Sequence, residues 1–146
     1  MSNFIIRDYV PCDYEDVIEL WLDIGLGNSQ RGDNAEVIAQ TLTSGGRLFV
    51  LANKNNNEIL GTSWLTNDKR RLYLHHFGIK KEYQGKGLSK QLMEASLKFA
   101  VDCGLQIKIE VHKENLVALN LYKKYGFKYL GDYDVYIVRN LKDIKI

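Results

Sequence analysis

The spacing of apolar and polar residues divides this chain into predicted strands and helices. Short runs rich in β-branched and aromatic residues predict strands, and apolar residues that recur every three or four positions predict helices. The predicted strands are Phe4–Val10, Arg47–Asn53, Glu58–Thr66, Arg71–Ile79, Leu105–Val111, Phe127–Leu130 and Tyr133–Arg139. The first predicted helix begins after Asp13 and is ended by Gly25 and Gly27. Three further helices are predicted at about Asn34–Thr43, Gly87–Val101 and Asn115–Tyr125.

This order of elements, βααβββαβαββ, predicts a mixed α/β (α+β) domain, because strands cluster early and alternate with helices later. We expect a mostly antiparallel sheet flanked by helices, with the last two strands closing it as a hairpin. Asp13 and Asp16 occupy the N-cap and capping-box positions of the first helix. The length of 146 residues suits a single domain spanning residues 1–146.

Composition narrows the function classes. The 45% hydrophobic and 26% charged fractions are ordinary for a globular protein, and the net charge is only +2. No run of basic residues suggests a nucleic-acid partner, and no stretch approaches the ~18 apolar residues that span a bilayer. Two widely separated cysteines and the lack of a leader pattern predict a reducing, cytoplasmic setting with no membrane partner.

The segment Tyr83–Ser89 lies between a predicted strand and a predicted amphipathic helix, and it contains Gly85 and Gly87. Glycines allow a sharp turn and a close ligand approach. The first N–H groups of a helix have no internal partners, and they attract anions such as a pyrophosphate. By itself, however, this pattern is equally typical of a plain tight turn.

Two common phosphate-binding motifs do not fit this segment. A Walker A loop needs a glycine where this chain has Lys80. A dinucleotide-binding fingerprint needs a third glycine where this chain has Lys90. The loop is therefore neither a Walker A loop nor a dinucleotide-binding fingerprint.

The segment resembles the pyrophosphate loop of the GNAT acetyltransferases, (Arg/Gln)-x-x-Gly-x-(Gly/Ala). Gln84 and Gly87 occupy its first two fixed positions, and Ser89 replaces the last small residue. Downstream, the spacing of Asn115, Ala118, Tyr122 and Gly126-Phe127 resembles the family's later motif. One helix and one strand separate the two blocks, as in that family. The resemblance covers nearly the whole chain and implies the acyl-CoA N-acyltransferase fold.

The resemblance implies an N-acetyltransferase that uses acetyl-coenzyme A as co-substrate and needs no metal. The pyrophosphate would bind at the loop and the pantetheine arm along the strand before it. Tyr122 would be the acid that protonates the departing thiolate. The residues implied to bind the coenzyme are Phe77, Gly78, Ile79, Gln84, Gly85, Lys86, Gly87, Leu88, Ser89 and Asn115. Tyr122 as a packed tyrosine and Asn115 as a helix cap remain open alternatives.

The attacking amine must lose a proton, and three residues are candidates for the base. Glu110 is favoured, because it matches a Glu-Val-x-x-x-Asn arrangement resembling the ribosomal-protein alanine acetyltransferases. A surface carboxylate paired with Lys108 is the alternative. His75 and His76 have suitable side chains, and alternation along a strand would point them to opposite faces.

The acceptor is the least determined part of the function. A small amine, an amino acid or a peptide or protein N-terminus fits equally well. The loop between the first two helices should shape its pocket, with Arg31 and Asp33 as the charged candidates. A non-catalytic acyl-CoA sensor and a plain interaction domain remain alternatives, and a homodimer is possible. The polar residues of the loop between the first two helices are Asn28, Ser29, Gln30, Arg31, Asp33 and Asn34.

Overall fold

The computed structural model describes residues 2–27 and 32–146. The chain divides into two compact units, Met1–Glu110 and Val111–Ile146. The expectation of a single domain stays a prediction.

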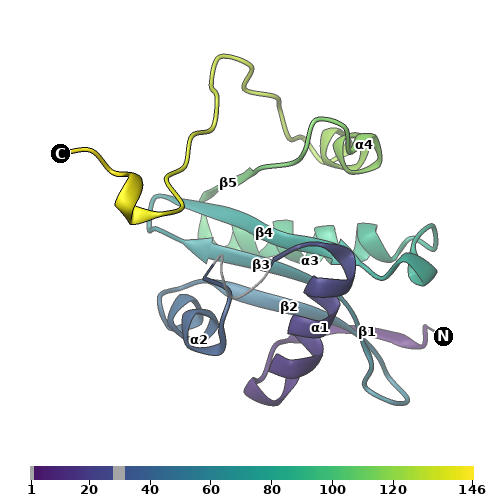
Figure 1. The fold of residues 1–146 in the computed structure, drawn as a ribbon. Coiled ribbons are helices and arrows are strands. Elements are labelled where there is room, and N and C mark those ends of the chain that lie inside the picture. Colours follow the sequence, from purple (N-terminus) through teal and green to yellow (C-terminus); the bar gives the residue numbers. More distant parts are fainter. Residues whose placement is uncertain (1, 28–31) are drawn as a thin grey trace. The chain divides into compact units, whose positions relative to one another are not determined.

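A five-stranded sheet forms the centre of the first unit, with its strands in sequence order (Figure 1). β1 to β4 pair antiparallel in succession, whereas β4 and β5 pair parallel. The predicted mostly antiparallel sheet is therefore confirmed. The strands are β1 (Phe4–Asp8), β2 (Arg47–Asn53), β3 (Ile59–Asn67), β4 (Arg71–Ile79) and β5 (Gln106–Ile109).

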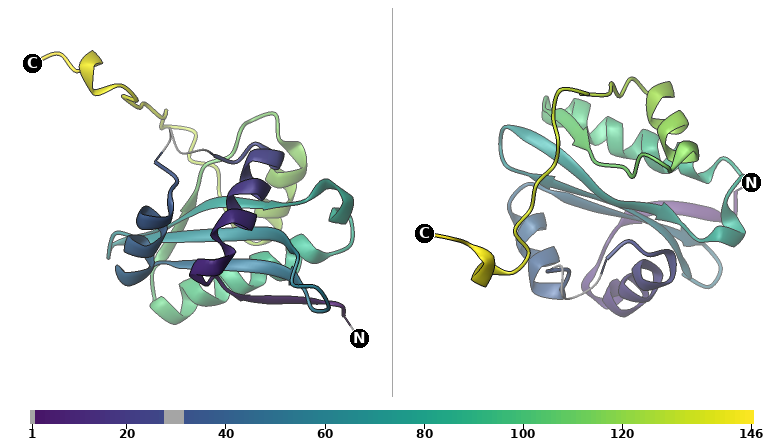
Figure 2. Two further views of the ribbon diagram at one scale, coloured as in Figure 1. Left: turned by 60° about the horizontal axis from the view of Figure 1, so that its bottom comes forward. Right: turned by 45° about the horizontal axis from the view of Figure 1, so that its top comes forward.

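Helices cover both faces of this sheet. α1 (Tyr14–Ile24) and α2 (Ala35–Thr43) lie on one face, and α3 (Leu88–Cys103) lies on the other (Figure 2). Neighbouring residues of β3 show the two sides: the Trp21 indole of α1 donates to Thr62 Oγ1 over 2.8 Å, while Ser63 Oγ bonds to Ser96 Oγ of α3 over 2.6 Å. Both faces are buried, which explains why β2 and β3 are apolar without strict alternation.

A β-bulge interrupts β4 next to β3. Thr62 is paired with Gly78 and Trp64 with His75, so two residues, His76 and Phe77, lie opposite one. His76 adopts φ 45°, which is uncommon for a residue with a side chain. The bulge places the rings of both His75 and His76 against Trp64, at centroid distances of 6.0 and 5.3 Å. The prediction that the two histidines point to opposite faces was therefore wrong.

Asp13 precedes α1, but its carboxylate does not cap that helix. It is buried, and it accepts hydrogen bonds from the Arg7 guanidinium at 2.7 and 3.0 Å and from the Val10 N–H at 2.9 Å. The predicted capping box at this position is wrong, because the half-buried guanidinium of Arg7 and the Val10 N–H take up the carboxylate.

The second unit contains α4 (Leu116–Lys124) and then an extended tail that ends in a short helical turn, Leu141–Asp143. The closing hairpin predicted at Phe127–Leu130 and Tyr133–Arg139 is absent from residues 111–146, all of which the structure describes. Strands need a ladder partner and an apolar surface against which to pack. No strand within residues 111–146 provides such a partner, and Tyr129 and Tyr136 are 89% and 90% exposed.

Within residues 2–27 and 32–146, no helix has the length and apolarity needed to cross a bilayer.

Candidate functional site

The loop between β4 and α3 has the backbone shape that its glycines predict. A 3₁₀ turn at Lys81–Tyr83 leads into Gly85 and Gly87, each with φ 78°. A Cβ at either glycine would meet nothing within 4 Å. Backbone conformation, and not crowding, therefore requires glycine at both positions.

The N-terminus of α3 is open to an incoming anion. Gly87 is the N-cap and has no side chain to occupy the first N–H groups. Leu88 is only 3% exposed and anchors the first turn in the core, whereas Lys86 and Gly87 are exposed. The first N–H groups of a helix lack internal partners, and together with the positive end of this 16-residue helix and the exposed ammonium of Lys86 they suit a phosphate.

Two loop side chains have structural contacts within the unit. Gln84 Nε2 donates to the carbonyl of Ile79 over 3.0 Å, so it ties the loop to the end of β4. The Lys86 ammonium lies 5.3 Å from the centre of the Tyr83 ring. These contacts connect the start of the loop to the end of β4 and to the 3₁₀ turn.

β4 and β5 separate beside this loop. Their last registered pair is Leu74 with Ile109, and β4 continues from residue 75 to 79 in contact with β3. Gly78 belongs to this extension, and a Cβ there would come within 2.8 Å of Ile24 and 2.9 Å of Leu26. The ends of the Ile24 and Leu26 side chains therefore pack directly on Gly78 and would have to move for a larger residue, while the bulge lies one position earlier.

Glu110 follows β5 directly, at the point where the two strands part. Its carboxylate lies 3.9 Å from the Lys108 ammonium, and its side chain is 41% exposed. Burial raises the pKa of the Tyr73 phenol, and a hydrogen bond to Glu110 raises it further. Tyr73 therefore stays protonated and donates to Glu110.

The two histidines are both engaged within the first unit. His75 is stacked on Tyr73, with ring centroids 3.8 Å apart, and its Nε2 is 2.8 Å from Thr66 Oγ1. Burial lowers the pKa of His75 to about 4, assisted by repulsion from His76 and Lys108. His75 is therefore neutral at physiological pH and a weak base.

His76 is held by Asp33, from the segment before α2. His76 Nε2 lies 3.0 Å from Asp33 Oδ2, with side-chain exposures of 12% and 10%. An ionised carboxylate only accepts hydrogen bonds, so Nε2 carries the proton. The His76 ring also contacts Trp21, with centroids 4.3 Å apart.

The predicted acceptor loop is only partly described. Asn28–Arg31, including the candidate Arg31, lie outside the described residues. Asn34 caps α2 by accepting from the Val37 N–H over 2.9 Å. Of the two charged candidates, Asp33 lies within the described residues, and it pairs with His76.

In the second unit, Asn115 Oδ1 accepts from the Ala118 N–H over 3.2 Å, so Asn115 caps α4. Tyr122 is 6% exposed and contacts the Phe127 ring at 5.7 Å. Burial raises the pKa of Tyr122 to about 12, which keeps its hydroxyl protonated. Both residues therefore have the structural roles that the sequence left open, and a role in binding or catalysis stays a prediction.

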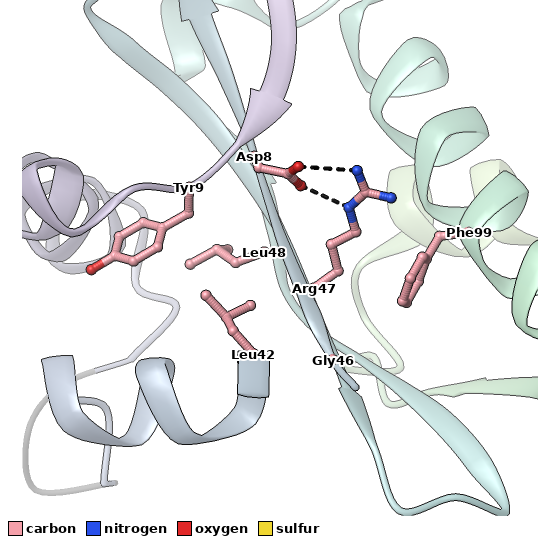
Figure 3. A pocket seen from close by; sticks show the side chains of 7 residues that line it. All are labelled: Asp8, Tyr9, Leu42, Gly46, Arg47, Leu48 and Phe99. Carbon is pink, nitrogen blue, oxygen red and sulfur yellow. Dashed lines mark hydrogen bonds and ion pairs between the residues drawn. The ribbon is translucent and has the colours of Figure 1, made fainter. Parts of the chain in front are cut away.

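A cavity of about 340 Å³ beside β2 is a poor candidate for a binding or catalytic site. Figure 3 shows that Asp8 binds the guanidinium of Arg47 through two hydrogen bonds, at 2.7 and 3.1 Å, which neutralises the charge there. Tyr9 and Leu48 lie on one side of the strand and Phe99 on the other, so the lining does not converge on one point. Within residues 2–27 and 32–146, no three potential metal ligands lie together.

Three comparisons relate this chain to known proteins. The family model described as Acetyltransferase (GNAT) family matches residues 14–127. Human N-acetyltransferase 8B is 28% identical over 85% of this chain and 56% of its own length. Spermine/spermidine N(1)-acetyltransferase of Bacillus subtilis (strain 168) is 32% identical over 47% of this chain and 46% of its own length. The chain thus spans about half the length of the curated relatives it matches.

Solved structures share the fold. A GNAT-family acetyltransferase from Staphylococcus aureus Mu50 superposes with a TM-score of 0.78 at 23% identity, covering 90% of this chain and 89% of the other. A GNAT-family acetyltransferase from Elizabethkingia anophelis with acetyl-CoA bound has a TM-score of 0.60 at 26% identity, covering 88% and 78%. The first of these likenesses concerns the fold alone.

Proposed function

Because this chain belongs to the GNAT family of acetyltransferases, we propose that it is an N-acetyltransferase that moves the acetyl group of acetyl-CoA to a primary amine. The observation that carries the proposal is the loop after β4. There, Gly85 and Gly87 present the free N-terminus of α3 beside strands that separate at Leu74 and Ile109.

The donor site consists of the loop and the end of β4. The N–H groups of Leu88 and Ser89 and the charge of Lys86 would bind the pyrophosphate. Gln84 stabilises the loop by donating a hydrogen bond to the carbonyl of Ile79. The part of β4 beyond its last registered pair with β5, which includes Phe77, Gly78 and Ile79, would supply backbone groups to the pantetheine arm. The Elizabethkingia anophelis relative is described with acetyl-CoA bound, which favours this choice of co-substrate.

Glu110 is the proposed base. The acceptor nitrogen bonds to the acetyl carbon, the carbon–sulfur bond breaks, and the nitrogen gives up a proton that Glu110 takes, directly or through water. The half-exposed carboxylate at the parting of β4 and β5 is accessible for this. His75 is too weak a base, and His76 is bound to Asp33 and is the second candidate.

Tyr122 is the proposed donor to the departing sulfur. Its hydroxyl is protonated, with a pKa of about 12, and its position in the Asn115–Phe127 motif is the reason for the assignment. A hydrogen bond to sulfur stabilises the charge that develops there as the thiolate leaves. Acetyl-CoA supplies only the thioester, and no step requires a metal.

The proposed acceptor class is a primary amine on a small molecule, an amino acid or a peptide or protein N-terminus. The Bacillus subtilis relative is named for acetylating spermine and spermidine, and both are small amines. A cytoplasmic location and a homodimer remain predictions.

Calorimetry tests the donor site directly. Acetyl-CoA should bind, intact coenzyme A should compete with it, and pantetheine, which lacks the pyrophosphate, should compete at least about tenfold more weakly. Equal competition by pantetheine would contradict the role of the loop. Binding of acetyl-CoA without acetylation of any amine, peptide or protein N-terminus would indicate a non-catalytic sensor.

A further inference from the structure

A second cavity, of about 350 Å³, lies where β4 begins, beside β5 and the turn that joins β3 to β4. Its volume falls in the range of small-molecule sites. Three cationic side chains contribute to its lining: Arg70, Arg71 and Lys108. All of its lining residues belong to the first unit.

The cations of this cavity are only partly neutralised. Asp68 is the carboxylate in the lining, and its Oδ1 accepts the backbone N–H groups of Arg70 and Arg71 at 2.8 and 2.7 Å. Its Oδ2 is 4.0 Å from Arg70 Nε, and Glu110 is 3.9 Å from Lys108. Arg71 has no ion pair with any residue in the described part of the chain. The cavity therefore keeps an excess of positive charge.

The remaining wall is aromatic and neutral. Tyr73 and His75 are stacked in parallel, with an interplanar angle of 9°. The hydrogen bond to Thr66 fixes the His75 ring, and the Lys108 ammonium lies 5.3 Å from the centre of the Tyr73 ring. This wall suits an aliphatic spacer, while the guanidinium groups suit an anion, which they bind in a fork geometry.

This wall also connects the cavity to the candidate base. Tyr73 hydrogen-bonds to Glu110, and the parallel register pairs Tyr73 with Lys108 and Arg71 with Gln106. Along the chain, Glu110 is thus two residues beyond Lys108 and four residues beyond Gln106, the partner of Arg71. At ~3.3 Å per residue, these separations are about 7 and 13 Å. The cavity lies on the side of Glu110 that is remote from the Gln84–Ser89 loop, because β4 runs from Arg71 toward that loop.

We propose that this cavity binds the anionic group of the acceptor, a carboxylate or a phosphate, while the acceptor's primary amine lies at Glu110. The acceptor is then an amine with an anion about 7–13 Å away along a flexible spacer. A diamine fits poorly, because its second ammonium would lie among the cations Arg70, Arg71 and Lys108. This inference rests on the proposed function, since it specifies the acceptor of that reaction.

Three amines of equal chain length test the inference: ε-aminocaproate, hexylamine and hexamethylenediamine. They end in a carboxylate, a methyl group and a second ammonium. We expect kcat/KM for ε-aminocaproate to exceed that for hexylamine by about tenfold, as for a charge-assisted hydrogen bond, and hexamethylenediamine to be the poorest acceptor. Aminohexyl phosphate shows which anion is preferred.

The double variant Arg70→Gln/Arg71→Gln removes the two guanidinium groups and leaves Lys108, the neighbour of Glu110, in place. Its KM for ε-aminocaproate should rise about tenfold at nearly unchanged kcat, while hexylamine should be unaffected. Lys98→Gln is the matched control, because Lys98 is an exposed cation on α3 paired with Asp102. Its selectivity should equal that of the wild type.

Equal kcat/KM for ε-aminocaproate and hexylamine would overturn the inference, as would a double variant that weakens all acceptors alike. Acetyl-CoA affinity of the double variant, measured by calorimetry, separates this failure from failure of the proposed function. If acetyl-CoA binds and other amines are acetylated but no anionic amine is preferred, only the acceptor inference fails. If acetyl-CoA does not bind the wild type, the proposed function fails first.

Discussion

Gly87→Glu, in the loop between β4 and α3, should have separable effects on acetyl-CoA binding and on the stability of the fold. It places a carboxylate at the N-terminus of α3, where the pyrophosphate is proposed to bind. Gly104→Glu is its matched control, because Gly104 ends the same helix with φ 67° and an added Cβ there would also meet open space. The two variants share the same backbone strain at opposite ends of one helix.

The expected stabilities follow from that geometry. A residue with a Cβ in the left-handed region costs about 1–2 kcal/mol, and this cost is common to both variants. The helix dipole contributes about 0.3–1 kcal/mol, which stabilises the negative charge that Gly87→Glu introduces at the N-terminus and destabilises the one that Gly104→Glu introduces at the C-terminus. At about 3 °C per kcal/mol for a chain of this size, Gly87→Glu should melt a few degrees above Gly104→Glu.

The expected order of the two variants in acetyl-CoA affinity is the reverse of their order in stability. A carboxylate ~4 Å from one phosphate charge is repelled by about 1 kcal/mol in water and about 4 kcal/mol at an effective dielectric constant of 20. The second phosphate and the lost access to the helix N–H groups add to this. Gly87→Glu should therefore weaken acetyl-CoA binding at least about tenfold, while Gly104→Glu binds as the wild type does.

Calorimetry and thermal denaturation on the same samples provide the test. The more stable of the two variants should be the one that binds acetyl-CoA more weakly. Acetyl-CoA affinities of Gly87→Glu and Gly104→Glu that agree within about threefold would refute the loop assignment.

Three further predictions concern catalysis and stability. Tyr122→Phe should lower kcat about 10²-fold or more at unchanged acetyl-CoA affinity, and undiminished turnover would exclude the acid role. Glu110→Gln should lower kcat about 10²-fold at unchanged acetyl-CoA affinity, and undiminished turnover would favour His76. Burial raises the pKa of Asp13, but its hydrogen bonds from Arg7 and Val10 outweigh burial and leave it below its ordinary value. Its ionised form therefore contributes stability above about pH 4 that is lost as pH falls through the lowered pKa. Urea denaturation at pH 7 should show Asp13→Asn costing about 3 kcal/mol, against under ~1 kcal/mol for Asp8→Asn at the exposed Arg47 pair.

The local pattern of apolar residues and glycines predicted much of the secondary structure of the first unit. β2 and β4 have the bounds that their apolar runs indicate, and α3 begins one residue after Gly87. These elements are determined by nearby residues, because periodicity and the glycines that begin and end them act over a few positions. The same holds for the backbone shape of the loop at Gly85 and Gly87.

Features that depend on register or on distant partners were not predictable. The bulge at His76 reversed the expected direction of one histidine, since a single extra residue changes the face of every side chain nearby. Tyr73 as the partner of Glu110 follows from the parallel register of β4 and β5. The Asp33–His76 pair joins residues 43 positions apart. The tail after Phe127 has the composition of strands but lacks a ladder partner.

The most direct test of the central claim is to follow the acetyl group itself. Acetyl-CoA labelled at the acetyl carbonyl carbon is mixed with an amine labelled at nitrogen, and the products are examined by NMR. We predict a carbonyl signal split by coupling to the labelled nitrogen, together with one free coenzyme A thiol for each amide formed, and loss of both in Gly87→Glu. Release of labelled acetate alone, or an intact thioester with every class of amine, would contradict the assignment of this chain as an N-acetyltransferase.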